Sequence, residues 1–240
     1  MTSVAEQIQE IAGKRRLKGW EPVPTTSKFT GDPGVRKVIQ RLCLLKNLEI
    51  QVGDWINAGL SEQEEETIAK ALKQNISDEE RHYRTVQALE AYVDPLLDKG
   101  EQLMAERIIQ LWAELPQTFA SAYALEMGVF FSILPWMAKH GSPYIQQASN
   151  WISDDEAVHV RIHLLCSKLC GQKLNVNHLQ AIRQTLAFLF RQVIDEKEFG
   201  QLVDRAFARL KTGKDDTMRD ESVLATPAFF EQRTREDIKY

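Results

Sequence analysis

One five-residue pattern occurs twice in this chain and constrains its fold more than any other feature. Asp78–His82 and Asp155–His159 both read Asp-Glu-x-x-His, and each copy lies inside a long helix-forming stretch. Residues three apart share one face of a helix, so the Glu and the His of each copy point the same way. A carboxylate and an imidazole on one buried helix face form half of a transition-metal site.

Two further glutamates stand alone in apolar surroundings on two other predicted helices. Glu49 follows Leu48, and Glu126 lies between Leu125 and Met127. Burying such a charge is costly unless the carboxylate is paired or binds a metal. Two Glu-x-x-His helices and two helices with one Glu each are the parts of a two-metal centre inside a four-helix bundle.

The spacing of the four glutamates favours one common layer. Glu49 and Glu79 are 30 residues apart, and so are Glu126 and Glu156. The midpoints fall close to the helix breaks expected at 59–61 and at Gly141. Each carboxylate would therefore lie about 20 Å from its turn, in the middle of the bundle.

We expect an all-α fold: a four-helix bundle with additional N- and C-terminal helices. Gly and Pro are scarce, at 12 and 8 residues, which favours long helices over a turn-rich sheet. Ser61 and Glu64 are expected to form a capping box, and Pro116 to kink or split the third long helix. The expected helices are 3–17, 35–58, 61–93, 101–139, 143–170 and one or two within 175–211. The expected organisation is an N-terminal helix and loop (1–34), a bundle core (35–170), packing helices (171–211) and a polar tail (212–240).

Composition limits the classes of partner and compartment. The net charge of −4 gives no overall basic footprint, so we do not expect a nucleic-acid partner. Three cysteines without regular spacing predict no disulfide framework, which favours a reducing cytoplasm; Cys166 and Cys170 are expected to be core residues. The N-terminus carries no apolar signal region, and no apolar run reaches about 18 residues, so no membrane span is expected.

The remaining histidines are expected to be peripheral to this chemistry. His163 lies one turn after His159, but no Glu follows His159 as a metalloprotease helix requires. We interpret His163 as a core residue or a neighbour of the ligands. His140 and His178 fall at predicted helix boundaries and are expected to be exposed.

The complete pattern resembles the ferritin-like di-iron carboxylate superfamily over residues 35–170. The Asp that precedes Glu in both copies is most similar to ribonucleotide reductase small subunits and bacterial multicomponent monooxygenases. This resemblance implies that Asp78 and Asp155 hydrogen-bond the ligand histidines and fix their tautomers. Since Glu79 and Glu156 come from the motif helices, they are the expected bridges, with Glu49 and Glu126 as terminal ligands. The predicted metal ligands are Glu49, Glu79, His82, Glu126, Glu156 and His159.

Four carboxylates and two imidazoles suit two Fe ions, with a Mn/Fe pair as an alternative. The expected function is an O₂-activating oxidase or oxygenase acting on a small or apolar substrate, with an electron-donor protein and a homodimer as further expectations. Radical-storing reductase subunits place a Tyr one turn beyond the first motif histidine, where this chain has Val86, so radical storage there is excluded. Tyr83, Tyr123 and Phe130 remain candidates for redox or substrate-lining residues.

Four alternatives stay open at this point. One is a ferritin-like ferroxidase or iron-handling protein, and another is a reductase-like subunit without the usual radical Tyr. A tRNA-modifying di-iron hydroxylase belongs to the same superfamily, but the acidic balance weighs against it. The last alternative, from a different class, is a non-catalytic bundle whose polar layer or metal serves structure alone.

Overall fold

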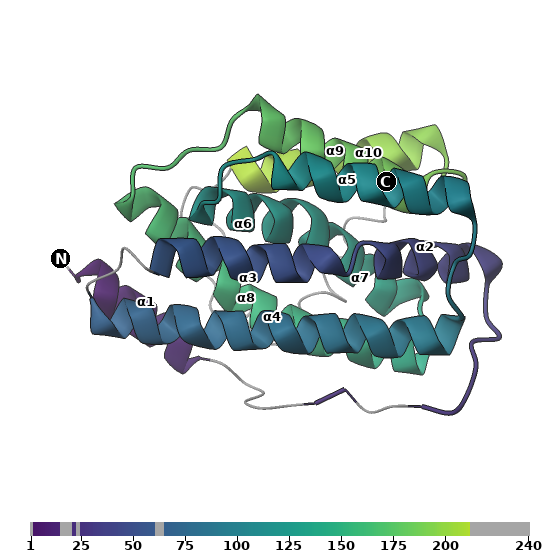
Figure 1. Cartoon of the computed structure of the whole chain (residues 1–240), viewed down its shortest axis with the longest axis horizontal. Coiled ribbons are helices and arrows are strands. Elements are labelled where there is room, and N and C mark those ends of the chain that lie inside the picture. Colours follow the sequence, from purple (N-terminus) through teal and green to yellow (C-terminus); the bar gives the residue numbers. More distant parts are fainter. Residues whose placement is uncertain (1, 15–20, 23–24, 61–64, 212–240) are drawn as a thin grey trace.

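The fold is built from helices that lie side by side along the long axis of the molecule (Figure 1). It is a computed structural model that describes residues 2–14, 21–22, 25–60 and 65–211. Within these ranges no residue is in a strand, so the all-α prediction is confirmed. The elements are α1 (Val4–Gly13), α2 (Pro33–Leu44), α3 (Asn47–Leu60), α4 (Glu66–Val93), α5 (Lys99–Ala113), α6 (Phe119–Leu125), η1 (Glu126–Phe130), α7 (Phe131–His140), α8 (Pro143–Leu169), α9 (Val176–Phe190) and α10 (Glu196–Lys211).

Four rows of helix surround the centre of the bundle. The α2–α3 row packs along α4, the α6–η1–α7 row packs along α8, and α4 also packs against α8. Figure 1 shows α2 and α3 following one another beside the long helix α4. This arrangement brings the middle of α4 and the middle of α8 together, and each carries one copy of the repeated motif.

The first long helix is broken, which corrects the expectation of one helix over 35–58. α2 ends at Leu44 and α3 begins at Asn47. The turn between them is tightened, because the amides of Leu45 and Leu48 donate three residues back, to Leu42 and Leu45. Neither Gly nor Pro marks this break, so sequence punctuation could not reveal it. Its consequence is that Glu49 lies in the first turn of α3.

The third predicted stretch, 101–139, is also divided, and Pro116 does mark a split. α5 ends at Ala113, and α6 begins after Thr118, whose side chain caps it by accepting from the Ser121 amide. α5 packs against α2, α3 and α9, so it stands outside the four central rows. The helix that carries Glu126 changes character there: η1 is a π-helical turn that begins at Glu126.

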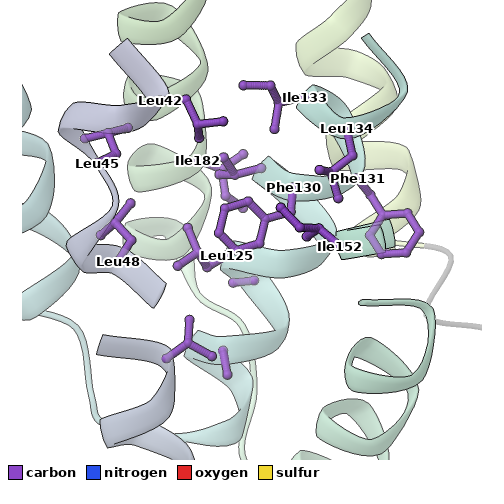
Figure 2. Close-up of a cluster of buried hydrophobic side chains, with 14 of the residues drawn as sticks. Leu42, Leu45, Leu48, Leu125, Phe130, Phe131, Ile133, Leu134, Ile152 and Ile182 are labelled. Carbon is purple, nitrogen blue, oxygen red and sulfur yellow. The ribbon is translucent and has the colours of Figure 1, made fainter. Parts of the chain in front are cut away.

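The terminal helices are part of one core. α1 packs against α4 and α8, while α9 and α10 pack against η1. A Cβ on Gly128 of η1 would lie 2.6 Å from Ile182 of α9, so the two helices approach closely only because this residue is Gly. Figure 2 shows Phe130 pointing into the apolar layer that includes Ile182 and Leu125.

Several local expectations are corrected by the structure. His178 is buried, not exposed, because its ring nitrogens contact Asn175 and Ser121 at the start of α9. Cys170 is exposed at the end of α8, whereas Cys166 is in the core as expected. The N-terminal helix ends at Gly13. The predicted capping box of 61–64 and the predicted tail of 212–240 lie outside the described residues.

The row Phe119–His140 is long and apolar enough to cross a membrane by composition. However, 83% of its apolar window is buried inside the bundle. This burial is typical of the core helix of a soluble protein.

Candidate metal centre

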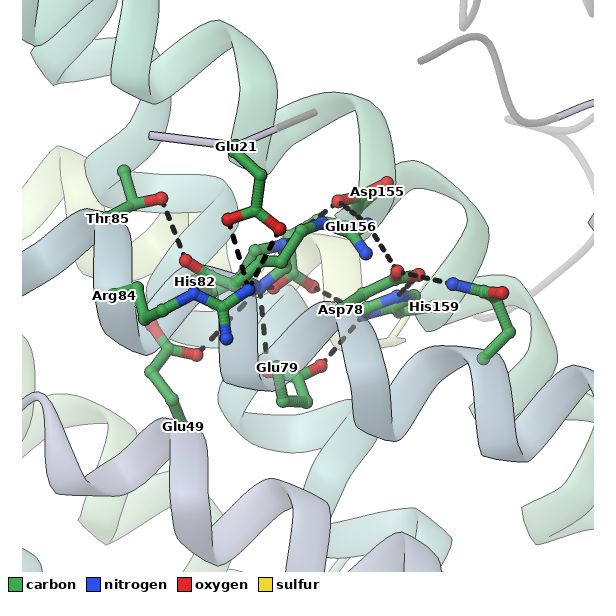
Figure 3. A network of polar contacts seen from close by, with 12 residues as sticks. Glu21, Glu49, Asp78, Glu79, His82, Arg84, Thr85, Asp155, Glu156 and His159 are labelled. Atoms are coloured by element: carbon green, nitrogen blue, oxygen red, sulfur yellow. Dashed lines mark hydrogen bonds and ion pairs between the residues drawn. The ribbon is translucent and has the colours of Figure 1, made fainter. Parts of the chain in front are cut away.

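The six predicted ligands converge from four elements at the centre of the bundle. α3 carries Glu49, η1 carries Glu126, and the repeated motifs on α4 and α8 carry one Glu and one His each. None of the six side chains is more than 3% exposed. Figure 3 shows five of them turned toward one another. The six are Glu49, Glu79, His82, Glu126, Glu156 and His159.

The two motif glutamates each reach both motif histidines. The Oε1 of Glu79 lies 2.8 Å from the Nδ1 of His159, and its Oε2 lies 3.5 Å from the Nδ1 of His82. For Glu156, Oε1 lies 3.3 Å from His82 Nδ1, and Oε2 lies 3.9 Å from His159 Nδ1. Each carboxylate therefore spans the space between the two imidazoles.

The two lone glutamates lie at opposite ends of this group. Glu49 Oε2 lies 4.0 Å from His82 Nδ1, and Glu126 Oε1 lies 3.9 Å from His159 Nδ1. The geometry thus divides into two halves that share Glu79 and Glu156, one ending in Glu49 and the other in Glu126.

The inward-facing atoms of the group lack ordinary hydrogen bonds. Within the described residues, buried atoms without a hydrogen-bond partner include both oxygens of Glu79 and of Glu156, one oxygen of Glu49, one of Glu126, and the Nδ1 of His159. The short contact between Glu79 and His159 is not aligned as a hydrogen bond. Unpaired buried carboxylates are costly, whereas cations placed among these atoms would satisfy them. The donor set therefore fits a metal centre.

Each motif aspartate contacts the histidine of the other motif. Asp78 Oδ2 lies 3.1 Å from the Nε2 of His159, and Asp155 Oδ2 lies 3.3 Å from the Nε2 of His82. A carboxylate can only accept, so each Nε2 carries a hydrogen. Each Nδ1 faces the shared glutamates, and once deprotonated it would offer its lone pair to a metal there.

Arg81 joins the two aspartates across α4 and α8. Its Nη2 contacts Asp78 in the turn before it and lies 3.2 Å from Asp155 Oδ2. The guanidinium is almost fully buried and places one positive charge beside two buried carboxylates. The sequence reading missed this residue, although its position between the Glu and His of the first motif was visible.

The electrostatics of the group reflect four carboxylates and two imidazoles crowded in a dry interior. Burial, and then repulsion by Glu79, raises the pKa of Glu49; burial, and then repulsion by Glu126, raises that of Glu156 to about 7. Burial also opposes ionisation of Glu79, but its contacts with His159 and His82 outweigh this and lower its pKa. Without cations, the repulsion among the buried carboxylates is relieved only when some of the six side chains keep their protons.

His163 and Asn75 extend the polar group beyond the predicted ligands. His163 Nδ1 lies 2.8 Å from Glu126 Oε2, and His163 Nε2 lies 3.1 Å from Asn75 Nδ2. The sequence predicted that His163 lies beside the ligands or in the core. The structure shows that His163 is buried and also contacts a predicted ligand. The sequence reading missed Asn75, although this residue lies one turn before Glu79 on the same helix.

The aromatic candidates differ in burial. Tyr123 is buried on α6, where burial raises its pKa to about 12. Tyr83 is only half-buried, and Phe130 belongs to the apolar layer of Figure 2. Val86, at the position that a radical-storing Tyr would occupy, is buried.

No family model, curated protein or solved structure matches this chain. One ligand atom from each of four buried residues lies within 4.8 Å of the others, so the group could hold metal. These residues are Glu79, His82, Glu156 and His159.

Proposed function

We propose that the chain is a ferritin-like di-iron carboxylate protein, an O₂-activating oxidase or oxygenase that acts on a small or apolar substrate. One observation carries this proposal: Glu79 and Glu156 each reach both His82 and His159. In each carboxylate the two oxygens face different imidazoles, and Glu49 and Glu126 add one further carboxylate beside each imidazole. Six donors arranged in two halves favour a pair of ions over a single ion.

The charge of the ligand set supports a pair of divalent cations. Four ionised carboxylates carry four negative charges, which two divalent ions neutralise without bound protons. Mixed carboxylate and imidazole donors suit Fe or Mn, and the absence of a thiolate from the set disfavours a structural zinc site. We propose two Fe ions, with Mn/Fe as the alternative.

The chain's own residues would hold the pair and keep the site dry. Asp78 and Asp155 would orient the imidazoles, and the ions would be held by Glu79 and Glu156 between the histidines and by Glu49 and Glu126 at the two ends. The apolar layer around Phe130 excludes bulk water and suits an apolar substrate. When bound, two Fe(II) ions supply electrons for the reduction of O₂. An electron-donor protein would return the pair to the reduced state.

The second candidate is a ferroxidase or iron-handling protein, in which iron is the substrate. The same ligand set supports it, and particle size in solution separates the two, because storage requires a large shell. A reductase-like subunit with a radical Tyr at the usual position is not proposed, since Val86 stands there. A cytoplasmic location and a homodimer remain predictions.

Metal analysis of the purified chain tests the proposal. After anaerobic loading with Fe(II) we expect two ions per chain and O₂ consumption on exposure to air. His82→Ala should lower the metal content sharply, whereas His140→Ala, an exposed histidine on α7, should not. Wild-type protein with no bound metal, or His82→Ala with two ions, would refute the proposal.

A further inference from the structure

His163 lies beside the proposed metal centre, although it is not one of the six proposed ligands. It is fully buried on α8, one turn beyond His159. The ring of Phe119 lies nearly parallel to it, with 6.3 Å between centroids and 23° between planes. A buried imidazole held on one face and hydrogen-bonded at both nitrogens has a defined orientation.

The neighbours of His163 decide which nitrogen carries its hydrogen. The Nδ2 of Asn75 can only donate, so the Nε2 of His163 accepts and its Nδ1 carries the hydrogen. On the other side, an ionised Glu126 can only accept, so it requires the same tautomer. Asn75 and Glu126 therefore agree, and Nδ1–H donates to Glu126 Oε2.

This hydrogen bond makes the two ends of the centre different. Oε2 of Glu126 is held by His163, while its Oε1 faces His159 and has no hydrogen-bond partner. Glu126 is thereby restricted to offering one oxygen. Among the described residues, Glu49 has no equivalent: the imidazole that it contacts is His82, itself a proposed ligand.

We propose that His163 is a positioning residue, which fixes Glu126 as a one-oxygen ligand. The two metal positions, although each has one copy of the motif, therefore differ in how firmly their terminal carboxylate is held. This inference rests on the proposed di-metal function. The position ending in Glu126 has a preset terminal carboxylate, whereas the position ending in Glu49 must order its carboxylate on binding. Preset ligands bind more tightly, so the Glu126 end fills first.

Titration of the metal-free chain with Co(II) under anaerobic conditions tests the inference by calorimetry and visible absorption. We expect wild-type protein to bind two ions in two distinguishable steps. His163→Leu should weaken the tighter step about 10- to 100-fold, leave the other nearly unchanged, and alter the absorption of the first ion bound. His163→Gln keeps a hydrogen-bond donor and should restore much of the affinity of the tighter step and of the absorption of the first ion. Asn75→Ala should weaken the tighter step less than His163→Leu does.

Two further variants fix the assignment. Glu49→Gln should weaken the other step, so Glu49→Gln with His163→Leu should weaken both. His178→Leu removes a buried histidine that contacts Ser121 and Asn175, and should leave both steps unchanged while lowering thermal stability. The inference fails alone if wild-type protein binds two ions but His163→Leu acts on both steps equally or on neither. Wild-type protein that binds no Co(II) refutes both this inference and the proposed function.

Discussion

At the scale of single residues, the centre depends on pairs that cross between the two motifs. Asp78 fixes His159, and Asp155 fixes His82, so each motif orients the imidazole of the other. The repeated Asp was visible in the sequence, and a role for it beside the ligand histidines was expected from resemblance. The crossing was not visible, because it depends on how α4 and α8 are rotated against each other.

Double-variant cycles test the crossing. Asp155→Asn should weaken metal binding at the His82 end about 10- to 100-fold, because the amide no longer holds the imidazole tautomer. Its effect should therefore be small in a His82→Ala background and undiminished in a His159→Ala background. The reverse holds for Asp78→Asn. If each Asp couples instead to the histidine of its own motif, the crossed geometry is wrong.

Two glycines of α3 give a matched test of packing. A Cβ on Gly59 would lie 2.3 Å from the ring of Phe119, which is buried and only 1% exposed. A Cβ on Gly53 meets nothing within 4 Å. We expect Gly59→Ala to lower the free energy of unfolding by about 1–3 kcal/mol and Gly53→Ala to raise it by about 0.5–1 kcal/mol. Denaturant titration measures both, and equal effects would contradict the close approach of Phe119.

At the scale of helices, the sequence predicted the rows better than their interruptions. Apolar stripes and the motif spacing placed the four carboxylates in one layer, because helical periodicity is a local property. The break before Asn47 and the π-helical turn at Glu126 lie where α3 packs against α4 and η1 packs against α9, and neither has a Gly or Pro where it begins. The same limit explains His178: its burial depends on Ser121 of a distant helix.

A buried charge cluster ties three of these helices together. Arg41 of α2 donates two hydrogen bonds to Glu101 of α5, at 3.0 and 3.2 Å, and also bonds the carbonyl of Leu189 in α9. Burial alone would raise the pKa of Glu101, but hydrogen bonds from Arg41 and Lys37 outweigh it and lower the pKa to about 2. This contact anchors α5 outside the four central rows.

The lowered pKa of Glu101 predicts how acid destabilises the fold. The pKa in the folded chain is below its ordinary value of 4.5, so the stabilisation is complete above about pH 4.5 and is lost as the pH falls toward 2. Glu101→Gln should lower the free energy of unfolding at pH 7 by about 2–3 kcal/mol and flatten its dependence on pH over that interval. Glu106→Gln, on the exposed side of α5, should keep the wild-type profile in the same titration.

At the scale of the whole molecule, burial of the polar centre lowers the free energy of unfolding, and the apolar packing of the rest of the core must offset this loss. Four carboxylates and two imidazoles occupy the middle of a bundle whose surroundings are aliphatic and aromatic. Apolar side chains in the same volume would give a more stable fold without metal. A fold that keeps this group is therefore expected to gain stability when cations bind.

Metal loading should raise the melting temperature. A ligand present at 100 times its Kd stabilises the folded chain by about 2.7 kcal/mol, or roughly 5–10 °C for a chain of this size. Thermal scans with Mn(II) and with a chelator, both without oxygen, measure the difference. His82→Ala, which removes a ligand from one end of the centre, should show a smaller difference between the two conditions than the wild type. A wild-type chain that shows no shift would argue against a metal-dependent core.

The crossed aspartates also bear on the order of events during assembly. The partners of each Asp–His pair lie 73 and 81 residues apart along the chain. A short segment that emerges from the ribosome with one complete copy of the motif therefore still lacks the aspartate that orients its histidine. Both motif helices must dock before either histidine is set, so we expect metal uptake to follow folding of the bundle and not to nucleate it.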